Sequence, residues 1–455
     1  MAAALQGAER GTMRLVLRAV GMGALGAVCL AGQAVASGYA LREQSAVGQG
    51  TSFAGATARG DDPSLAFFNP ATLALLPGIQ AATVASLIVP HAEVQRGSAS
   101  RTALLGGSAI GGSLGGDDAA ADALVPAFAA SAQVAPGWTI GISVNSPWGL
   151  VTKYDADFIG RYHALTSSLR TINVAPSIAW RPLPNLAVGA ALQIQHADAR
   201  LSNAVDFGAI GFAQSPALRA AGFAPGRFDG RATVTGDDVG FGFQLGLIYD
   251  PVPGTRLGLS YRSAVNHTLR GDGDFDGVPA PLRGTFPATT GARAKLTTPD
   301  IAAFGVTQAV GDRWTVMADL SWTNWSRFQT LRVDFEDAPA TSVEQRWRDT
   351  WSISLGAEYR WSDAVKLRAG VAYDPTPVRE ETRTPRIPDS DRYWASLGAS
   401  WQVRPGLELT AAYTHIFADK ARVRLREEGA RFAGNLDLDY DSQVDIVALQ
   451  ARIAF

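Results

Sequence analysis

The residues that could act as a nucleophile or a metal ligand do not form a complete set in this sequence. The stretch GGSLG at 111–115 matches G-x-S-x-G, the pattern that places a nucleophilic serine between a strand and a helix. Here Ser113 stands in a glycine-rich run, with neither element predicted beside it. The five histidines show no metal-ligand spacing. We therefore expect no catalytic residues, no metal site and no enzymatic activity.

Alternating acids offer a second kind of chemistry, the binding of a hard cation. Asp272, Asp274 and Asp276 alternate with glycine and phenylalanine in DGDFDG. Carboxylate oxygens are the ligands that calcium prefers, so a calcium loop is one interpretation. A loop whose acids are simply hydrated is the other, and it is the one we adopt. No cofactor is expected from the sequence.

The first 36 residues predict a secretory signal peptide. Its features are a positive flank (Arg14, Arg18), an apolar core (19–32) and small residues for cleavage before Ser37 (34–36). Met13 could be the true start, because residues 1–12 add nothing to this pattern. A retained membrane anchor is the alternative, but the apolar run is short and rich in glycine.

Composition limits the classes of protein further. The single cysteine, Cys29, lies in the signal segment, so the exported chain has no disulfide and no cysteine metal site. A net charge of −2 gives no reason to expect nucleic-acid binding. Beyond the N-terminus, no run of 18 or more apolar residues exists to form a membrane helix.

From residue 79 onward, apolar residues alternate with polar or small ones, as in a strand with one apolar face. In 366–373, for example, Leu367, Ala369 and Val371 share one face. The alternation predicts strands at 79–89, 125–135, 138–146, 169–181, 186–201, 239–250, 255–269, 295–309, 313–325, 349–360, 366–373, 392–403, 407–416 and 443–455. Short turns are predicted at 136–137, 182–185, 251–254, 310–312, 361–365 and 404–406. Long links alternate with them at 90–124, 147–168, 202–238, 270–294, 326–348, 374–391 and 417–442.

Short turns at one end, long loops at the other and an even strand number are typical of an outer-membrane barrel. A soluble sandwich shows the same alternation, but tryptophans near both strand ends favour two membrane-interface girdles. The girdle residues are Trp138, Trp180, Trp314, Trp361 and Trp401 beside turns, and Trp148, Trp322, Trp325, Trp351, Trp394 and Tyr413 near loops. Because unpaired backbone groups are costly in hydrocarbon, a spanning sheet must close. We predict an all-β fold, an outer-membrane, transmembrane antiparallel β-barrel of about 14 strands over 79–455, with both termini periplasmic.

Residues 37–78 precede the first strand and lack its alternation. The segment is rich in glycine and alanine, with apolar patches, and a disordered tail would be more polar. A barrel of this size has a lumen that either stays open or holds a plug. The sequence therefore predicts that 37–78 forms an N-terminal plug, or hatch, inside the barrel.

Motifs spread along the chain resemble the FadL family of outer-membrane transporters for long-chain fatty acids and hydrocarbons, TodX-like members included. The matching stretches are GYALREQSAVGQGTSFAG (38–55), DDPSLAFFNPA (61–71), SPWGLVTKYDADFIGRYHAL (146–165), LGLSYRSAVNHTLRGD (257–272), SWTNWSRFQTLR (321–332) and YDPTPVREETRTPRIPDSDRYWASLG (373–398). The most specific pieces are the NPA step and the IPDSDRYW block. A terminal aromatic on an amphipathic last strand, Phe455, also looks like the signal read by barrel-assembly machinery.

The resemblance implies a route for the ligand. It enters from outside, binds in apolar pockets, moves toward the hatch and leaves sideways where an early strand kinks inward. Asn69, Pro70 and Ala71 match the hatch motif. Pro126, in the strand at 125–135, is the position-matched candidate for the wall kink, because proline belongs at a strand edge or bulge.

The resemblance also implies ligand contacts. Arg332 matches a basic binding residue of the family, and Arg200 is a looser match; each would bind a carboxylate headgroup. The alternative is that both face lipopolysaccharide phosphate or solvent. A dry pocket stabilises an acyl chain by about 0.8 kcal/mol per buried CH₂. Candidates for lining the pathway, each equally explained by packing, are Phe53, Phe67, Phe68, Phe128 and Phe158.

The predicted function is passive uptake of hydrophobic small molecules, with long-chain fatty acids as the first substrate class. Aromatic or aliphatic hydrocarbons are the alternative. A nonspecific porin, an outer-membrane lipase and a purely structural protein are weaker rivals, given the hatch and the incomplete catalytic sets. Expected partners are the ligand, outer-membrane lipid and lipopolysaccharide, and the barrel-assembly machinery during biogenesis. No nucleic acid is expected, and a monomer is implied by the resemblance.

Overall fold

The computed structural model describes residues 38–116, 118–426 and 432–455. The signal peptide predicted for 1–36 lies outside them. The elements in chain order are α2 (Ala46–Gln49), η1 (Pro63–Phe67), η2 (Pro70–Leu75), β1 (Ile79–Ser100), η3 (Ala103–Leu105), β2 (Ala123–Ala135), β3 (Trp138–Asn145), β4 (Gly149–Lys153), β5 (Thr166–Leu183), β6 (Leu186–Asp206), α3 (Phe207–Gln214), α4 (Pro216–Ala220), β7 (Asp229–Val252), β8 (Thr255–Arg262), β9 (Val265–Asp276), η4 (Ala280–Leu282), β10 (Thr289–Thr298), β11 (Ile301–Val310), β12 (Trp314–Thr323), η5 (Trp325–Arg327), β13 (Thr330–Phe335), β14 (Thr341–Glu344), β15 (Thr350–Arg360), β16 (Val365–Asp374), η6 (Glu380–Thr382), β17 (Arg392–Arg404), β18 (Leu407–Ala418), β19 (Ala421–Leu425) and β20 (Asn435–Ala454), where η marks a 3-10 helix. Within the described ranges, none of the helices has the length and apolar character needed to cross a membrane.

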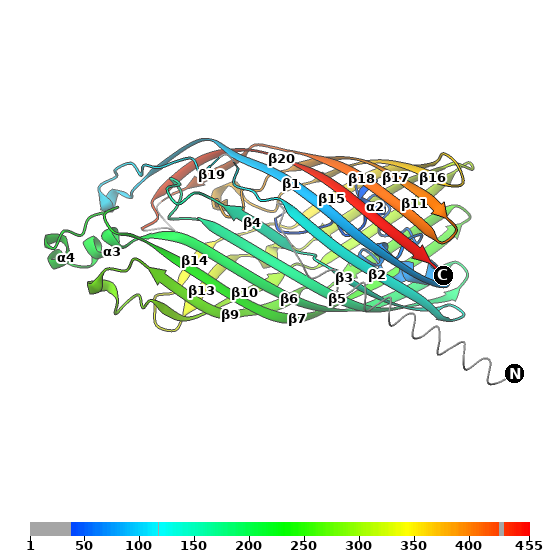
Figure 1. Cartoon of the computed structure of the whole chain (residues 1–455), viewed down its shortest axis with the longest axis horizontal. Helices are drawn as coiled ribbons and strands as arrows, with labels where there is room; N and C mark the ends of the chain where they lie inside the picture. Colours follow the sequence, from blue (N-terminus) through cyan, green and yellow to red (C-terminus); the bar gives the residue numbers. More distant parts are fainter. Residues whose placement is uncertain (1–37, 117, 427–431) are drawn as a thin grey trace.

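The strands form one antiparallel sheet that closes on itself (Figure 1). Closure is made by β1, which pairs with β2 on one side and with the last strand, β20, on the other. Six wall strands are interrupted and so count as two elements each: β3/β4, β8/β9, β10/β11, β12/β13, β14/β15 and β18/β19. The wall therefore has fourteen strands, which confirms the predicted transmembrane barrel.

Alternation along the wall places apolar side chains outside and small or polar ones inside. In β18, Leu409, Tyr413 and Phe417 are exposed, whereas Ala412 and Thr414 between them are buried. This is the arrangement expected when lipid covers the outer face and a lumen or plug contacts the inner one.

Several strands are longer than predicted. β1 extends to Ser100 instead of residue 89, and β7 begins at Asp229 instead of residue 239. A strand crosses the membrane in about 9–11 residues, so the extra length continues the barrel on the long-loop side. There, stretches such as DGRATVTGDD at 229–238 lose the apolar face on which the sequence prediction relied.

The aromatic girdle is clear on the short-turn side. Trp138 and Trp180 stack with ring centroids 5.3 Å apart, and both are exposed. Toward the long loops, Trp351 and Tyr413 are also exposed. The girdle prediction was wrong for three residues that are buried: Trp148, Trp325 and Trp394. They occupy inward positions or breaks in the wall, where they pack inside the barrel.

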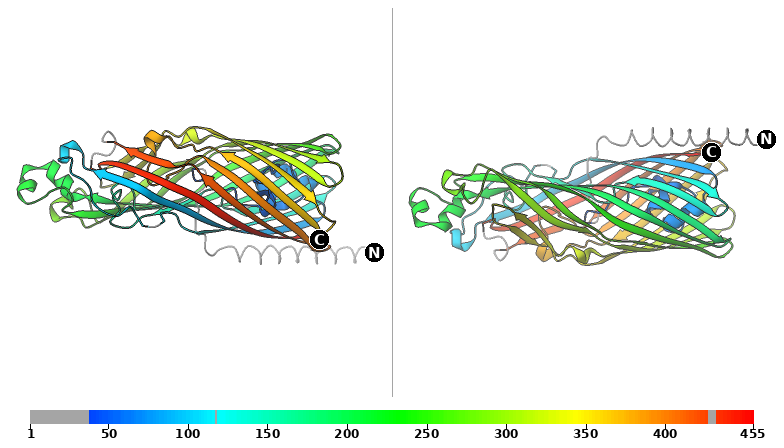
Figure 2. Two further views of the ribbon diagram at one scale, coloured as in Figure 1. Left: turned by 90° about the horizontal axis from the view of Figure 1, so that it is seen from above. Right: turned by 90° about the horizontal axis from the view of Figure 1, so that it is seen from below.

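Residues 38–78 lie inside the barrel, toward the end that carries the C-terminus (Figure 2). Two short helices there follow from local sequence: Asp62 and Asn69 cap the backbone N–H groups of Ser64 and Ala71. Each cap is followed by a proline, which needs no N–H partner at the first helical position. We call residues 38–78 the hatch from here on.

Candidate functional site

The hatch backbone rests directly on glycines of the wall. A Cβ on Gly246 would lie 1.9 Å from Asn69 Oδ1, and one on Gly258 would lie 2.2 Å from the Thr57 carbonyl oxygen. Five more wall glycines would bring a Cβ within 3.1 Å of hatch backbone atoms: Gly189, Gly305, Gly356, Gly370 and Gly398. This role was not predicted, although glycine in a strand interior often marks a close backbone approach.

Asn69 ties the hatch both to itself and to the wall. Its Nδ2 donates to the carbonyl of Thr57 at 2.7 Å and to those of Leu247 and Leu259, both at 3.2 Å. Its Oδ1 accepts from the Ala71 N–H at 3.0 Å. The side chain is fully buried, so this set of bonds is out of contact with water.

Ion pairs of the buried Arg59 also hold the hatch, where it meets β15. Arg59 of the hatch lies 2.7 Å from Asp61 and 2.9 Å from Glu358 of β15. Glu358 also pairs with Arg368 of β16 at 2.8 Å. Removing one member of such a buried pair leaves an uncompensated charge, which is strongly destabilising. The cluster therefore resists movement of this part of the hatch.

The wall is interrupted between Asn145 and Gly149, and the start of the hatch fills the break. The N–H of Leu41 donates to the carbonyl of Pro147 at 2.8 Å, and the N–H of Gly149 donates to the carbonyl of Tyr39 at 2.8 Å. The hatch thus supplies the hydrogen bonds that a neighbouring strand would otherwise provide.

Pro126 does not itself form this interruption. It pairs with Ala85 of β1 in an unbroken register. Pairing between β2 and β3 begins only at Phe128 and Val144, so the part of β2 that holds Pro126 faces the interruption without a ladder to β3 or β4 among the described residues. The break thus lies one strand later than the kink was predicted, because residues 146–148 bind the hatch instead of β2.

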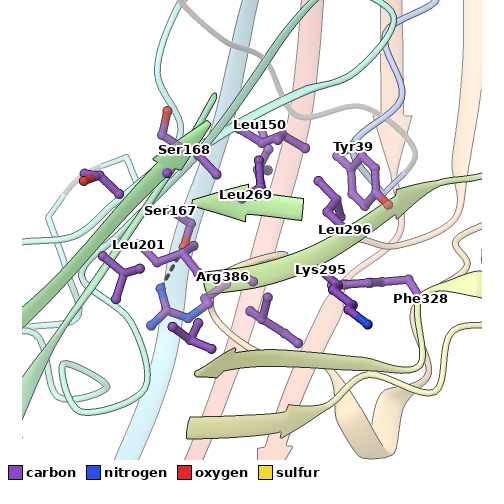
Figure 3. Close-up of a pocket in the computed structure, with 18 of the residues that line it drawn as sticks. Tyr39, Leu150, Ser167, Ser168, Leu201, Leu269, Lys295, Leu296, Phe328 and Arg386 are labelled. Carbon is purple, nitrogen blue, oxygen red and sulfur yellow. Dashed lines mark hydrogen bonds between the residues drawn. The ribbon is translucent and has the colours of Figure 1, made fainter. Parts of the chain in front are cut away.

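An outer cavity with about 100 Å³ of open volume lies above the hatch (Figure 3). It is lined mostly by apolar side chains, among them Leu150, Leu201, Leu296 and Phe328. The loop between β16 and β17 folds inward to close it, because Ile387 of this loop packs in the same buried cluster as Leu150 and Leu296. From the sequence, this loop was predicted only as a long link at 374–391.

Arg386 of the same loop brings a cation to the outer cavity. Its guanidinium donates to the carbonyls of Thr166 and Ser202, to Ser167 Oγ and to Asn203 Oδ1, at 3.1–3.3 Å. All of these acceptors are neutral, and Arg386 forms no ion pair with any residue that the structure describes. Burial lowers the pKa of Arg386 to about 10, so it stays charged at neutral pH. Arg386 was not among the predicted site residues.

An aromatic cluster separates the outer cavity from a second one nearer the hatch. Tyr39 packs against Trp148, Trp325 and Trp347, with ring centroids 4.8–5.7 Å apart. Its hydroxyl is buried and has no hydrogen-bond partner within the described ranges. An unbonded buried hydroxyl costs about 1–3 kcal/mol, so Tyr39 is held less firmly than its burial indicates.

The inner cavity has about 80 Å³ of open volume and lies between the hatch and the wall. Phe67 and Phe68 of the hatch line it, together with Pro147 and Trp148 of the wall interruption. Arg262 of β8 also lines it. The inner cavity therefore adjoins the place where the barrel wall is broken.

The two arginines assigned from the resemblance point away from the outer cavity. Leu331 and Val333 line it, but Arg332 between them is exposed and pairs with Asp334 at 2.6 Å. Arg200 is likewise exposed, on the face of β6 opposite Leu201. Period-two alternation decides both cases, because neighbours on a strand face opposite sides.

The predicted phenylalanines fall into two groups. Phe67 and Phe68 line the inner cavity, and Phe53 packs on Phe68 with ring centroids 5.4 Å apart. Phe158 is buried in the outer loops, stacked on Tyr154, and Phe128 is half-buried; neither lines the two cavities.

The residues considered for nucleophilic catalysis and for cation binding have ordinary hydrogen-bond partners. Ser113 lies in a loop and donates to Asp157 Oδ1 at 2.8 Å. Asp274, in β9, accepts from Thr289 Oγ1. No group of three acidic, histidine or cysteine side chains in the described ranges is placed to hold a metal ion.

Together, the closed barrel, the lipid-facing apolar surface, the bound hatch and the apolar cavities above it define a plugged outer-membrane channel. The sequence profile of the outer membrane protein transport family (OMPP1/FadL/TodX) matches residues 27–455. The chain belongs to this family.

Individual relatives and a solved structure support the family assignment. A Neisseria meningitidis serogroup B relative, named only as an outer membrane protein, is 31% identical and covers 95% of this chain and 97% of its own. The long-chain fatty acid transport protein of Escherichia coli K12 is 27% identical, over 86% and 90% of the two chains. A Pseudomonas aeruginosa FadL homologue superposes with a TM-score of 0.84 at 26% identity, over 92% of this chain and all of that one. This chain is thus an outer-membrane transporter for hydrophobic substrates.

Proposed function

We propose that the transported molecules are long-chain fatty acids. The observation that carries this proposal is Arg386, a buried cation with only neutral partners at the wall of a mostly apolar cavity. A hydrocarbon would gain nothing from such a group, and burying an unpaired charge is costly. A carboxylate would compensate the charge, while the acyl chain contacts the leucines and Phe328.

The route inward requires the hatch to move. The outer cavity, about 100 Å³ in open volume, and the inner cavity, about 80 Å³, are separate, with the Tyr39 aromatic cluster between them. Displacing Tyr39 would join the outer cavity to the inner one, and the inner one adjoins the wall interruption. Tyr39 also supplies the carbonyl that bonds Gly149. Its movement would therefore lengthen the cavity and free one edge of the break for lateral exit.

The test is uptake of labelled long-chain fatty acid by a deletion strain that carries wild type or Arg386→Met. A neutral long-chain alkane is measured in parallel, and barrel assembly is checked by heat-modifiable gel mobility. We expect acid uptake to fall at least about tenfold in the variant, the typical effect of losing a charge-assisted hydrogen bond, with alkane uptake retained.

Arg96→Met is the matched control, since Arg96 is an exposed arginine that pairs with Asp439 on the outer wall. If wild type restores alkane or monoaromatic uptake but no acid uptake, the hydrocarbon alternative replaces the fatty-acid proposal. Equal acid uptake by wild type and Arg386→Met would remove the assigned role of this arginine.

A further inference from the structure

The two lumen cavities share an uncommon feature, a buried arginine with no acidic partner. In the inner cavity this residue is Arg262, only 7% exposed. Its guanidinium donates to the Phe67 carbonyl and lies 3.4 Å from Gln244 Oε1. It also lies over the Phe67 ring, 4.1 Å from the centroid. These partners are all uncharged, and Arg262 makes no ion pair within the described residues.

The other charged groups of the inner cavity differ from Arg262 in the sign of their charge or in burial. Asp319 accepts two bonds from Thr57, one from its N–H and one from its hydroxyl, both at 3.0 Å. Asp374 lies 3.5 Å from Arg392. Arg42, the second cation, bonds Ser352 Oγ at 3.3 Å. Of the residues that line this cavity, Arg262 therefore combines deep burial with a charge that no acid balances.

The location of Arg262 in the barrel would suit it to bind a carboxylate. The outer cavity, with Arg386, and the inner cavity, with Arg262, lie on the two sides of the Tyr39 cluster. Pro147 and Trp148 of the wall interruption line the inner cavity as well. A carboxylate that reached Arg262 would stand beside the break through which the acyl chain leaves.

We propose that Arg262 is a second carboxylate anchor, which receives the fatty-acid headgroup from Arg386 and holds it during lateral exit. This inference rests on the proposed fatty-acid function. Two anchors, each in its own cavity, divide the transfer into two shorter steps. A single deep site would instead bind the acid and release it slowly.

The test separates binding from transport. Arg262→Met is compared with wild type, Arg262→Lys and Arg256→Met, since Arg256 lies on the same strand but already pairs with Asp250 at 2.7 Å. Purified proteins are titrated with a long-chain fatty acid, and uptake of the acid and of its methyl ester is measured in cells. Heat-modifiable mobility confirms that each barrel assembles.

For Arg262→Met we expect acid uptake at least about tenfold below wild type, acid affinity within about twofold and ester uptake retained. Arg262→Lys keeps the charge and should retain most acid uptake. Equal losses for acid and ester would show that Arg262 only supports Phe67 and the hatch, and unchanged acid uptake would also overturn the inference. Absence of acid uptake by wild type would instead refute the fatty-acid function itself.

Discussion

Replacing Asn69 by alanine should loosen the hatch without unfolding the barrel. The substitution removes the two N–H donors of Nδ2, which are shared among three carbonyls, and one bond accepted by Oδ1. At about 1 kcal/mol for each of these three bonds, their loss weakens this contact by about 3 kcal/mol. Because 1.4 kcal/mol is a factor of ten, local opening becomes about a hundredfold more frequent. The barrel ladder contains none of these side-chain bonds, so it should be unaffected.

Hydrogen exchange followed by mass spectrometry on peptides covering 63–78 measures this opening. We expect exchange of the hatch amides to accelerate by at least about a hundredfold, while wall peptides keep their protection. Asn173→Ala is the matched control, since Asn173 is equally buried but bonds Asn145 and Gln193 of the wall. If Asn69→Ala exchanges its hatch amides within about twofold of wild type, the Asn69 contact is not what holds the hatch.

Four further predictions follow from the same geometry. Gly246→Ala should accelerate hatch exchange as Asn69→Ala does, because the new Cβ would clash with Asn69 Oδ1; normal exchange would contradict the close packing. Burial raises the pKa of Glu43 from 4.5 to about 7, so its stabilising protonated form is fully present below pH 4.5 and lost as pH rises through 7. Exchange of residues 39–49, corrected for intrinsic rates, should therefore quicken between pH 5 and pH 8, and Glu43→Gln should abolish this trend. Arg332→Met should keep at least about half of wild-type acid uptake, since a surface ion pair contributes only about 0–1 kcal/mol; a large loss would return this residue to the ligand site. Tyr39→Ala should raise exchange of residues 39–44 at least about tenfold, since truncating a buried aromatic side chain typically costs about 3–5 kcal/mol, and unchanged exchange would argue against the aromatic cluster as the barrier between the cavities.

Most of the predicted fold rests on the alternation of apolar and polar residues along the strands. Leu409, Tyr413 and Phe417 identify an outward face from residue type alone, because lipid requires apolar contact at every second position. The short turns could also be predicted from the sequence, since a two-residue connection such as Pro136–Gly137 allows few backbone conformations. Outer strand ends such as 229–238 could not be predicted, because beyond the membrane neither face of a strand has to be apolar.

The candidate headgroup arginines could not be placed from the sequence alone. Arg332 and Arg200 stand one residue away from cavity-lining positions, and on a strand that single step places a side chain on the opposite face. Arg386 lies in a loop, where no period indicates direction. Its position depends on carbonyls of β5 and β6, which are about 180–220 residues away in the chain.

By itself, the sequence determined the strand pattern and the alternation of turns with loops, because each depends on neighbours a few residues apart. The tertiary structure decided which strand breaks, which wall glycines seat the hatch and which cations face the lumen. Those features arise where segments distant in the chain meet. The hatch backbone packs on Gly246, the Tyr39 carbonyl accepts from Gly149, and Arg386 bonds Ser167 of β5. Local residue types do not predict such long-range contacts, because the partners come together only when the barrel closes around the hatch.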